Sequence, residues 1–197
     1  MTRIACVFPG QGSQYVGMGK DLYDQYQEVS RVFREASLAL DYDLVKLSCA
    51  IFTLLQNNGL QPAVVAGHSL GEYSALVAAG AISFSDAVRL VHYRGKLMEE
   101  AFPSGQGTMA AVLGMKREKL SEILSIYSKG HVEAANFNCP GQIVISGEKN
   151  AVAAVSEEIV KQGGKVIPLA VSGPFHSSLM KPAAEKFKTV LEKVEFT

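Results

Sequence analysis

The 197-residue sequence has few of the features that mark secreted, metal-binding or nucleic-acid-binding proteins. Its three cysteines, Cys6, Cys49 and Cys139, are odd in number and widely spaced without a CxxC pair, so neither a disulfide framework nor a zinc site is predicted. Basic and acidic residues balance at 19 each, which argues against a nucleic-acid partner. No apolar run reaches transmembrane length and no signal region follows Met1, so we expect a cytoplasmic protein without a membrane partner.

Hydrophobic residues make up 48% of the chain, and strand-like and helical patterns alternate along it. The length favours one large domain, or a main domain with a small companion. Outside the middle of the chain, the patterns predict strands over Ile4–Phe8 and Ala63–Ala66, and helices over Glu28–Leu40, Leu44–Asn58, from a cap at Ser83 or Ser85 to Phe102, and over Ser178–Val194.

From Thr108 the pattern changes to a compact series of strand, helix, strand, strand, helix and strand, which is the order of a ferredoxin-like unit. We therefore predict an α/β protein in which residues 104–170 form an inserted subdomain and residues 1–103 and 171–197 form the main domain. The four strands of the subdomain are expected at Met109–Leu113, Val132–Asn136, Gln142–Ser146 and Lys165–Leu169.

The most informative stretch runs from Val64 to Glu72, where a β-branched strand ends in Gly-x-Ser-x-Gly and passes into a helical pattern. This context is typical of a nucleophile elbow, in which Ser69 occupies a sharp turn and Gly67 and Gly71 allow strand and helix to approach. The N–H of Leu70 would be available to an oxyanion, because the first amides of a helix have no partner inside it. The alternative is a glycine-rich turn with an incidental serine.

A second glycine-rich loop, Pro9 to Gln14, follows the first strand. It lacks the glycine spacing of a dinucleotide loop and the GK[ST] of a phosphate loop. It is either a tight connection or the source of a second oxyanion donor.

Two charged or titratable side chains stand out. Arg94 interrupts an apolar helical stripe, so it requires either a carboxylate from the protein or a carboxylate carried by the substrate. His176 lies in a turn-rich segment where its ring could act as the base of a serine nucleophile, or it could cap the next helix. The stripe around Arg94 consists of Leu90, Val91, Leu97 and Met98.

Four blocks in this order resemble the malonyl-CoA:acyl-carrier-protein transacylases of fatty-acid synthesis and the acyltransferase domains of polyketide synthases. They are FPGQGSQ from Phe8, GHSLGEYSAL from Gly67, the RG of Arg94 and Gly95, and PFHSSLM from Pro174. The resemblance implies an α/β-hydrolase-like core with a ferredoxin-like insert. It also implies malonyl-CoA as a substrate, acyl carrier protein as a partner and no cofactor or metal.

By this resemblance each candidate residue acquires a role. Ser69 is the acylated nucleophile and His176 its base, while Gln11 and Leu70 supply backbone oxyanion donors. Arg94 binds the free carboxylate of the malonyl group. Phe175 before the histidine accompanies malonyl selectivity within the family.

The sequence also departs from the family pattern. Between Ser48 and Phe52 the family has an additional stretch that we do not find, and the chain ends at Thr197 before the strands that complete the family's sheet. Two strands outside the insert cannot hide both faces of a parallel sheet, so we expect the 197 residues to be part of a longer functional polypeptide.

Two other functions remain open at this point. A serine hydrolase or thioesterase would have the same elbow, although it normally shows an acidic triad member and an HGGG-type loop. A non-catalytic module that docks a carrier protein would keep the fold without a complete site.

Overall fold

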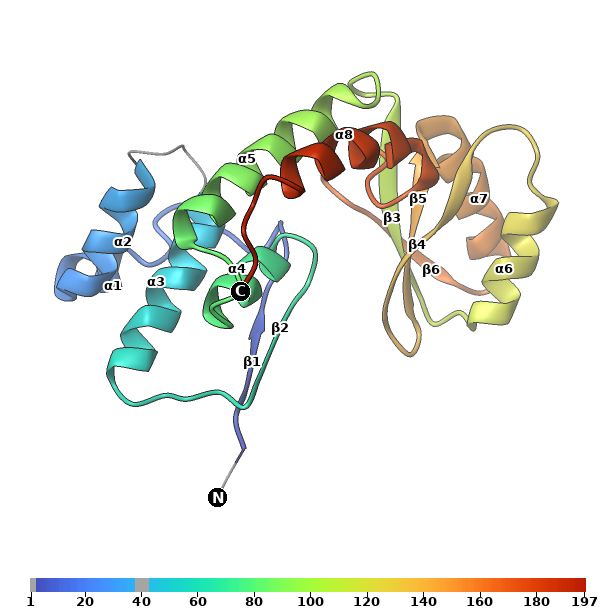
Figure 1. Ribbon diagram of the computed structural model, residues 1–197. Coiled ribbons are helices and arrows are strands. Elements are labelled where there is room, and N and C mark those ends of the chain that lie inside the picture. Colours follow the sequence, from blue (N-terminus) through green and yellow to red (C-terminus); the bar gives the residue numbers. More distant parts are fainter. Residues whose placement is uncertain (1–2, 38–42) are drawn as a thin grey trace. The chain divides into compact units, whose positions relative to one another are not determined.

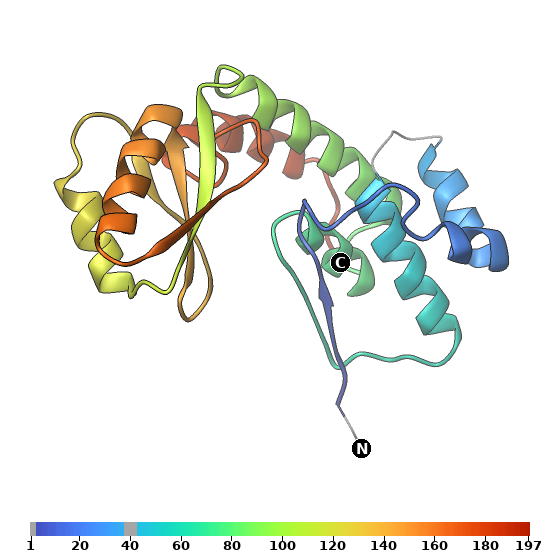
Figure 2. The same ribbon diagram turned by 180° about the vertical axis from the view of Figure 1, so that it is seen from behind.

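The computed structural model describes residues 3–37 and 43–197, and the chain divides into two compact units. The first contains Met1–Tyr93 and Thr189–Thr197, and the second contains Arg94–Lys188. Figures 1 and 2 show the elements of each unit from two sides. The predicted limits of the inserted subdomain, residues 104–170, lie within the second unit and stay a prediction.

The first unit is built on a two-stranded parallel sheet. Strand β1 (Ala5–Phe8) pairs with β2 (Val64–Gly67), with Phe8 opposite Gly67, so both strands end at the same edge. The predicted strands are confirmed to within one residue at each end. The helices of this unit are α1 (Lys20–Gln25), α2 (Gln27–Ser37), α3 (Asp43–Asn57), α4 (Gly71–Ala78) and the first part of α5 (Phe84–Glu100).

The start of α5 agrees with the cap predicted from the sequence, and its end at Glu100 comes two residues before the predicted Phe102. Ser83 is the residue that caps α5, because its Oγ accepts the N–H of Asp86 at 3.0 Å and donates to the Asp86 carboxylate at 2.6 Å. The predicted end of the second helix, at Leu40, lies outside the described residues.

Apolar side chains of the helices form the core of the first unit. Phe8 of β1 meets Phe52 of α3 with ring centroids 5.8 Å apart, and both are buried. This contact fixes the inner side of β1. The larger of the two buried clusters consists of Val29, Val32, Val45, Cys49, Ala50, Leu70 and Val91.

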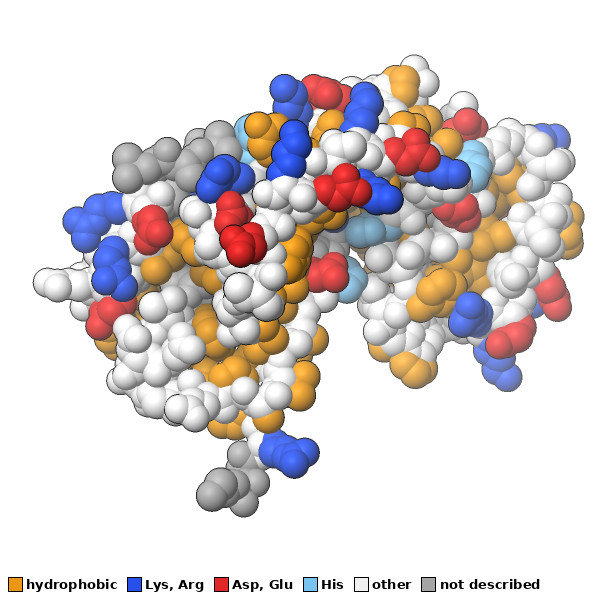
Figure 3. All heavy atoms as spheres, viewed as in Figure 1, with side chains coloured by type: hydrophobic (Ala, Val, Ile, Leu, Met, Phe, Trp, Pro, Cys, Tyr) orange, Lys and Arg blue, Asp and Glu red, His pale blue; other side chains and the backbone are white. Residues whose placement is uncertain are grey.

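The other side of the small sheet is open to solvent in the described structure. Val7 is 74% exposed and Val64 is 61% exposed, and Figure 3 shows hydrophobic side chains on the surface of this unit. A sheet of two strands leaves this apolar surface uncovered in the described structure, which agrees with the prediction that two strands cannot hide both faces.

The second unit contains the predicted ferredoxin-like series. The strands of this series pair in the order β4-β5-β3-β6, all antiparallel, and helices α6 and α7 follow β3 and β5. The predicted α/β fold class is confirmed. The elements are β3 (Gly107–Leu113), α6 (Arg117–Ile126), β4 (Val132–Cys139), β5 (Gln142–Glu148), α7 (Lys149–Lys161) and β6 (Lys165–Pro168).

One face of this sheet packs against α6 and α7. Because side chains alternate along a strand, Ala110, Ile145 and their neighbours on that face join the helices in one buried cluster. Ile145 of β5 and Ile159 of α7 are fully buried there. The opposite face carries Ser146, which is fully buried.

The end of the chain differs from the prediction. Instead of one helix over Ser178–Val194, a 3₁₀ turn, η1 (Ser178–Met180), precedes helix α8 (Lys181–Leu191). Pro182 has no N–H to donate to the carbonyl of Ser178, so the helical ladder cannot run through this point. After Leu191 the chain continues in turns, in which Lys193 N–H donates to Val190.

In residues 3–37 and 43–197, no helix combines the length and hydropathy needed to cross a bilayer.

The three cysteines lie in different environments, which predicts different reactivity. Burial raises the pKa of Cys49 to about 12, whereas Cys139 at the end of β4 is exposed. Because the thiolate is the nucleophile, only about one Cys49 thiol in 10⁴ is ionised at pH 8. We expect iodoacetamide at pH 8 to alkylate Cys139 and to leave Cys49 unmodified, measured by peptide mass spectrometry.

In denaturant, both cysteines should react at similar rates, which serves as the control. Alkylation of Cys49 as fast as Cys139 in the native protein would contradict its burial.

Candidate active site

Ser69 occupies the turn between β2 and α4. Its φ is +53°, and among the described residues it shares a positive φ with only one other non-glycine residue, His176 at +60°. Such left-handed backbone costs about 1–2 kcal/mol for a residue with a Cβ atom. The predicted strand, sharp turn and helix around Ser69 are therefore confirmed.

The two glycines of the motif explain how this turn closes. A Cβ atom on Gly67 would collide with the backbone of Gly71 and Glu72, and one on Gly71 would collide with the carbonyl of Phe8. Strands β1 and β2 and helix α4 thus meet backbone to backbone. No side chain larger than hydrogen fits at either position.

The backbone amide of Leu70 lies just before the first hydrogen bonds at the start of α4. The amides of Gly71 and Glu72 donate to the carbonyls of His68 and Ser69, at 3.0 and 3.2 Å. The amide of Leu70 precedes both, while its side chain is buried in the core of the first unit. Leu70 is therefore held in place by its side chain, and its backbone lies in the turn.

The loop after β1 lies against this turn. A Cβ on Gly10 would come within 2.7 Å of the ring nitrogen Nδ1 of His68, and the His68 amide donates to the Phe8 carbonyl at 3.1 Å. Gln11 follows Gly10 in an exposed turn, where the amide of Gly12 donates to the Gln14 side chain at 2.9 Å. Both loops that carry predicted oxyanion donors thus leave the same edge of the parallel sheet.

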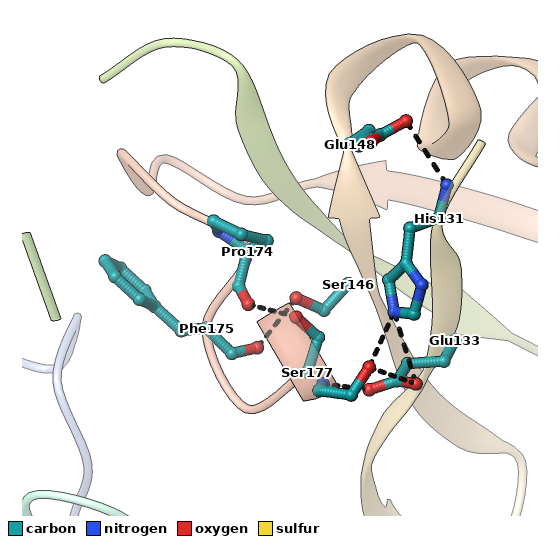
Figure 4. A network of polar contacts seen from close by, with 8 residues as sticks. His131, Glu133, Ser146, Glu148, Pro174, Phe175 and Ser177 are labelled. Atoms are coloured by element: carbon teal, nitrogen blue, oxygen red, sulfur yellow. Dashed lines mark hydrogen bonds and ion pairs between the residues drawn. The ribbon is translucent and has the colours of Figure 1, made fainter. Parts of the chain in front are cut away.

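His176 lies in the second unit, in the turn between β6 and η1. The carbonyl of Phe175 accepts a hydrogen bond from the Ser146 hydroxyl at 2.7 Å, and the carbonyl of Pro174 accepts one from Ser177 at 2.6 Å (Figure 4). His176 itself is exposed. The residues on both sides of the histidine are therefore anchored.

Arg94 and His176 line the same pocket in the second unit. The pocket has a volume of about 440 Å³, and its walls include Leu97 and Met98 of α5 and Met180 of η1. A positive side chain and an imidazole thus face one space with apolar walls. Such a pocket suits a small ligand that carries a carboxylate.

The structure brings the five predicted site residues together as two groups. Ser69, Leu70 and Gln11 belong to the first unit, and Arg94 and His176 belong to the second. In the described part of the chain, His, Cys, Asp and Glu side chains form no group of three or more that could hold a metal ion.

Residues 42–196 match the model of the acyl transferase domain family. This chain belongs to the acyl transferase family. The chain is 49% identical to the malonyl CoA-acyl carrier protein transacylase of Bacillus subtilis, in a match that covers 98% of this chain and 68% of that protein. The family resemblance predicted from the four blocks is confirmed.

Solved structures of the acyl transferase family have the same fold. FabD from Acinetobacter baumannii superposes with a TM-score of 0.94 at 46% identity, over 100% of this chain and 70% of that one. A malonyl-transacylase in complex with a type II PKS acyl-carrier protein gives a TM-score of 0.95 at 43% identity, over 100% and 72%.

The relatives also contain residues that this chain lacks within the aligned region. The match to the transacylase of Staphylococcus aureus extends over 221 positions, whereas this chain has 197 residues and all of them are covered. This difference agrees with the predicted absence of an internal stretch.

Two residues that bind the turn of the candidate base were missed from the sequence. Ser146 and Glu133 hold the turn that carries His176, but neither belongs to one of the four blocks. The one available signal was Ser146, a small polar residue at the end of the apolar run Ile143–Ile145.

The strained backbone of Ser69 predicts an unusual order of stabilities. Ser69→Ala and Ser69→Gly both remove the hydroxyl, but only alanine keeps a Cβ in the left-handed region. Relief of that strain exceeds the entropy that glycine gains on unfolding, so the glycine variant should be more stable by about 0.5–1 kcal/mol. Chemical denaturation of the two variants measures the difference.

Ala79, at the end of α4 with a φ of −77°, provides the control, because glycine there should not stabilise the protein. An alanine variant of Ser69 at least as stable as the glycine variant would argue against the strained turn.

Proposed function

We propose that this protein transfers a malonyl group from malonyl-CoA to the pantetheine thiol of an acyl carrier protein through a malonyl-serine intermediate. The observation that carries the proposal is that Arg94 and His176 line one pocket, so that a cation for a carboxylate and a base for acyl transfer face the same space. Membership of the acyl transferase family supports it.

In the first half-reaction, His176 accepts the hydroxyl proton of Ser69 as Ser69 Oγ attacks the thioester carbonyl. The oxyanion accepts hydrogen bonds from the amides of Leu70 and Gln11. The carbon–sulfur bond then breaks, and the departing CoA thiolate takes the proton from His176. This step requires His176 within about 2.6–3.2 Å of Ser69 Oγ.

The second half-reaction reverses these roles. His176 takes the proton of the pantetheine thiol, whose sulfur attacks the malonyl ester. The ester bond to Ser69 breaks and Ser69 Oγ recovers a proton from His176. One base thus serves both steps, and the chemistry needs no resident cofactor or metal.

Arg94 provides the selectivity for malonate in this proposal. Its planar guanidinium matches the geometry of a carboxylate, which acetyl groups lack. Phe175, half-buried next to the base, adds to malonyl selectivity. The proposal also includes a cytoplasmic location and a domain division into residues 1–103 with 171–197 and residues 104–170.

Incubation with radiolabelled malonyl-CoA, with and without acyl carrier protein, tests the function. We expect label on the protein, transfer to carrier protein when it is added, and no labelling of Ser69→Ala. Ser172→Ala is the control, because Ser172 is an exposed serine outside the elbow and should leave labelling intact.

Release of free malonate without transfer would instead indicate a hydrolase, and the absence of both label and release would indicate a docking module. Acylation of a residue other than Ser69, located by peptide mass spectrometry, would refute the assigned nucleophile.

The role of Arg94 predicts a change of selectivity. Arg94→Ala should lower malonyl transfer by about 10- to 100-fold, the range expected for lost hydrogen bonds to a charged group, while acetyl transfer holds or rises. Steady-state rates with malonyl-CoA and acetyl-CoA measure this.

Arg89→Ala is the matched control, because Arg89 lies on the same helix, is exposed and pairs with Asp86 at 3.1 Å. Equal loss for both acyl groups in Arg94→Ala would instead support a protein carboxylate as the partner of Arg94.

A further inference from the structure

The turn that carries His176 rests on a row of side chains on the open face of the antiparallel sheet. In the register of the strands, Ser146 of β5 lies opposite both Glu133 of β4 and Met109 of β3. Their chain neighbours Ile145 and Ala134 point to the helix side, so this row points away from α6 and α7. The row is therefore available to hold another segment.

Ser146 holds the turn on one side of the histidine. It is fully buried, and its hydroxyl donates at 2.7 Å to the carbonyl of Phe175, the residue immediately before His176. A buried hydroxyl without such a bond would be costly. The only hydroxyl proton of Ser146 is thus committed to this backbone position.

Glu133 holds the turn on the other side. Its carboxylate accepts the backbone N–H of Ser178 through Oε1 and the Ser178 hydroxyl through Oε2, the latter at 3.3 Å. His131 adds a contact of 2.9 Å from its Nε2 to the same hydroxyl (Figure 4). The backbone is therefore fixed one residue before His176 and two residues after it.

The hydrogen bonds from Ser146 and Glu133 stabilise a turn with unfavourable backbone geometry. The backbone of His176 is in the left-handed region, and its side chain is exposed, so burial of the imidazole does not hold it there. Strained backbone of this kind persists where surrounding bonds fix it. Hydrogen bonds to Phe175 and Ser178 supply that constraint.

Ser178, His131 and Glu133 do not form a catalytic triad. The hydroxyl of Ser178 and the carboxylate of Glu133 both approach the same ring nitrogen of His131, Nε2, at 2.9 and 3.4 Å. In a triad the acid binds the other ring nitrogen and leaves the first to the nucleophile. The arrangement therefore connects η1 to strand β4 and has a structural role.

We propose that Ser146 and Glu133 are positioning residues for malonyl transfer, which hold the backbone on both sides of His176 and so fix the direction of its imidazole. The inference rests on the proposed role of His176 as base. When the imidazole of His176 is poorly oriented, the rate of the chemical step falls. Binding of malonyl-CoA through Arg94 is retained, so KM changes little.

The variants Ser146→Ala and Glu133→Ala test this in the full chain. Ser146→Ala loses one hydrogen bond to the turn and should lower kcat for malonyl transfer by about tenfold. Glu133→Ala loses two and should lower kcat by at least as much, and KM for malonyl-CoA should stay within about twofold in both variants. Glu133→Gln keeps a carbonyl oxygen for the Ser178 N–H and should recover most of the lost rate. A glutamine variant as slow as the alanine variant would overturn the role of Glu133.

Glu158→Ala is the matched control. Glu158 of α7 accepts a hydrogen bond from Gln162 Nε2 at 2.7 Å, and in the described residues no hydrogen bond joins its side chain to the His176 turn or to His131, so its loss should leave kcat unchanged. A similar fall of kcat in Glu158→Ala would mean a general effect on the second unit and would overturn the proposal. So would unchanged kcat in both Ser146→Ala and Glu133→Ala.

A readout without turnover separates this inference from the proposed function. In NMR spectra of protein with ¹³C-labelled histidine, the His176 ring signal, assigned with His176→Ala, should move in Ser146→Ala and Glu133→Ala and stay in place in Glu158→Ala. A signal unmoved in all three would overturn the positioning. Full transfer by His176→Ala would refute the role of His176 as base. The ring signal of His176 in the Ser146 and Glu133 variants would still show whether these residues position its side chain.

Discussion

The first unit depends on a close approach of backbones. Strand β1, strand β2 and helix α4 meet where Gly67 and Gly71 leave no Cβ atom between them. This approach turns the chain sharply at Ser69 and brings the loop of Gln11 to the same edge as the amide of Leu70. The proposed nucleophile and the two proposed backbone donors can then lie at the same edge because glycines leave room for the close approach.

Ser69 and His176, the two non-glycine residues with positive φ in the described part of the chain, are held by different means. Ser69 is fixed by surrounding backbone, so the vulnerable positions nearby are glycines. His176 is fixed by polar side chains of a neighbouring sheet, so the vulnerable positions there are Ser146 and Glu133. Strain thus accompanies both residues proposed to exchange the proton, as is common at active sites.

Local patterns were enough to predict most of the fold. Hydrophobic periodicity predicted the strands and helices because each element buries one face. The elbow could be recognised because its motif, Gly67 to Gly71, spans five residues, whereas the contact of Gly71 with the carbonyl of Phe8 joins distant parts of the chain. The predicted start of the last helix at Ser178 was wrong, because Pro182 has no N–H and interrupts an otherwise helical pattern. The ties to the His176 turn depend on strand register and bulges, which single-sequence patterns do not specify.

The sequence separation between paired strands has a consequence for the order in which the protein folds. In the first unit Ala5 pairs with Val64, 59 positions later, whereas in the second unit Cys139 pairs with Gln142 across a tight hairpin. Closing a long loop costs more entropy than closing a short one. We therefore expect the hairpin to form early in folding and the parallel pair of β1 and β2 to form late. Amide hydrogens of β1 and β2 should accordingly be among the last to gain protection from exchange during refolding. The geometry around Ser69 then becomes a late event of folding.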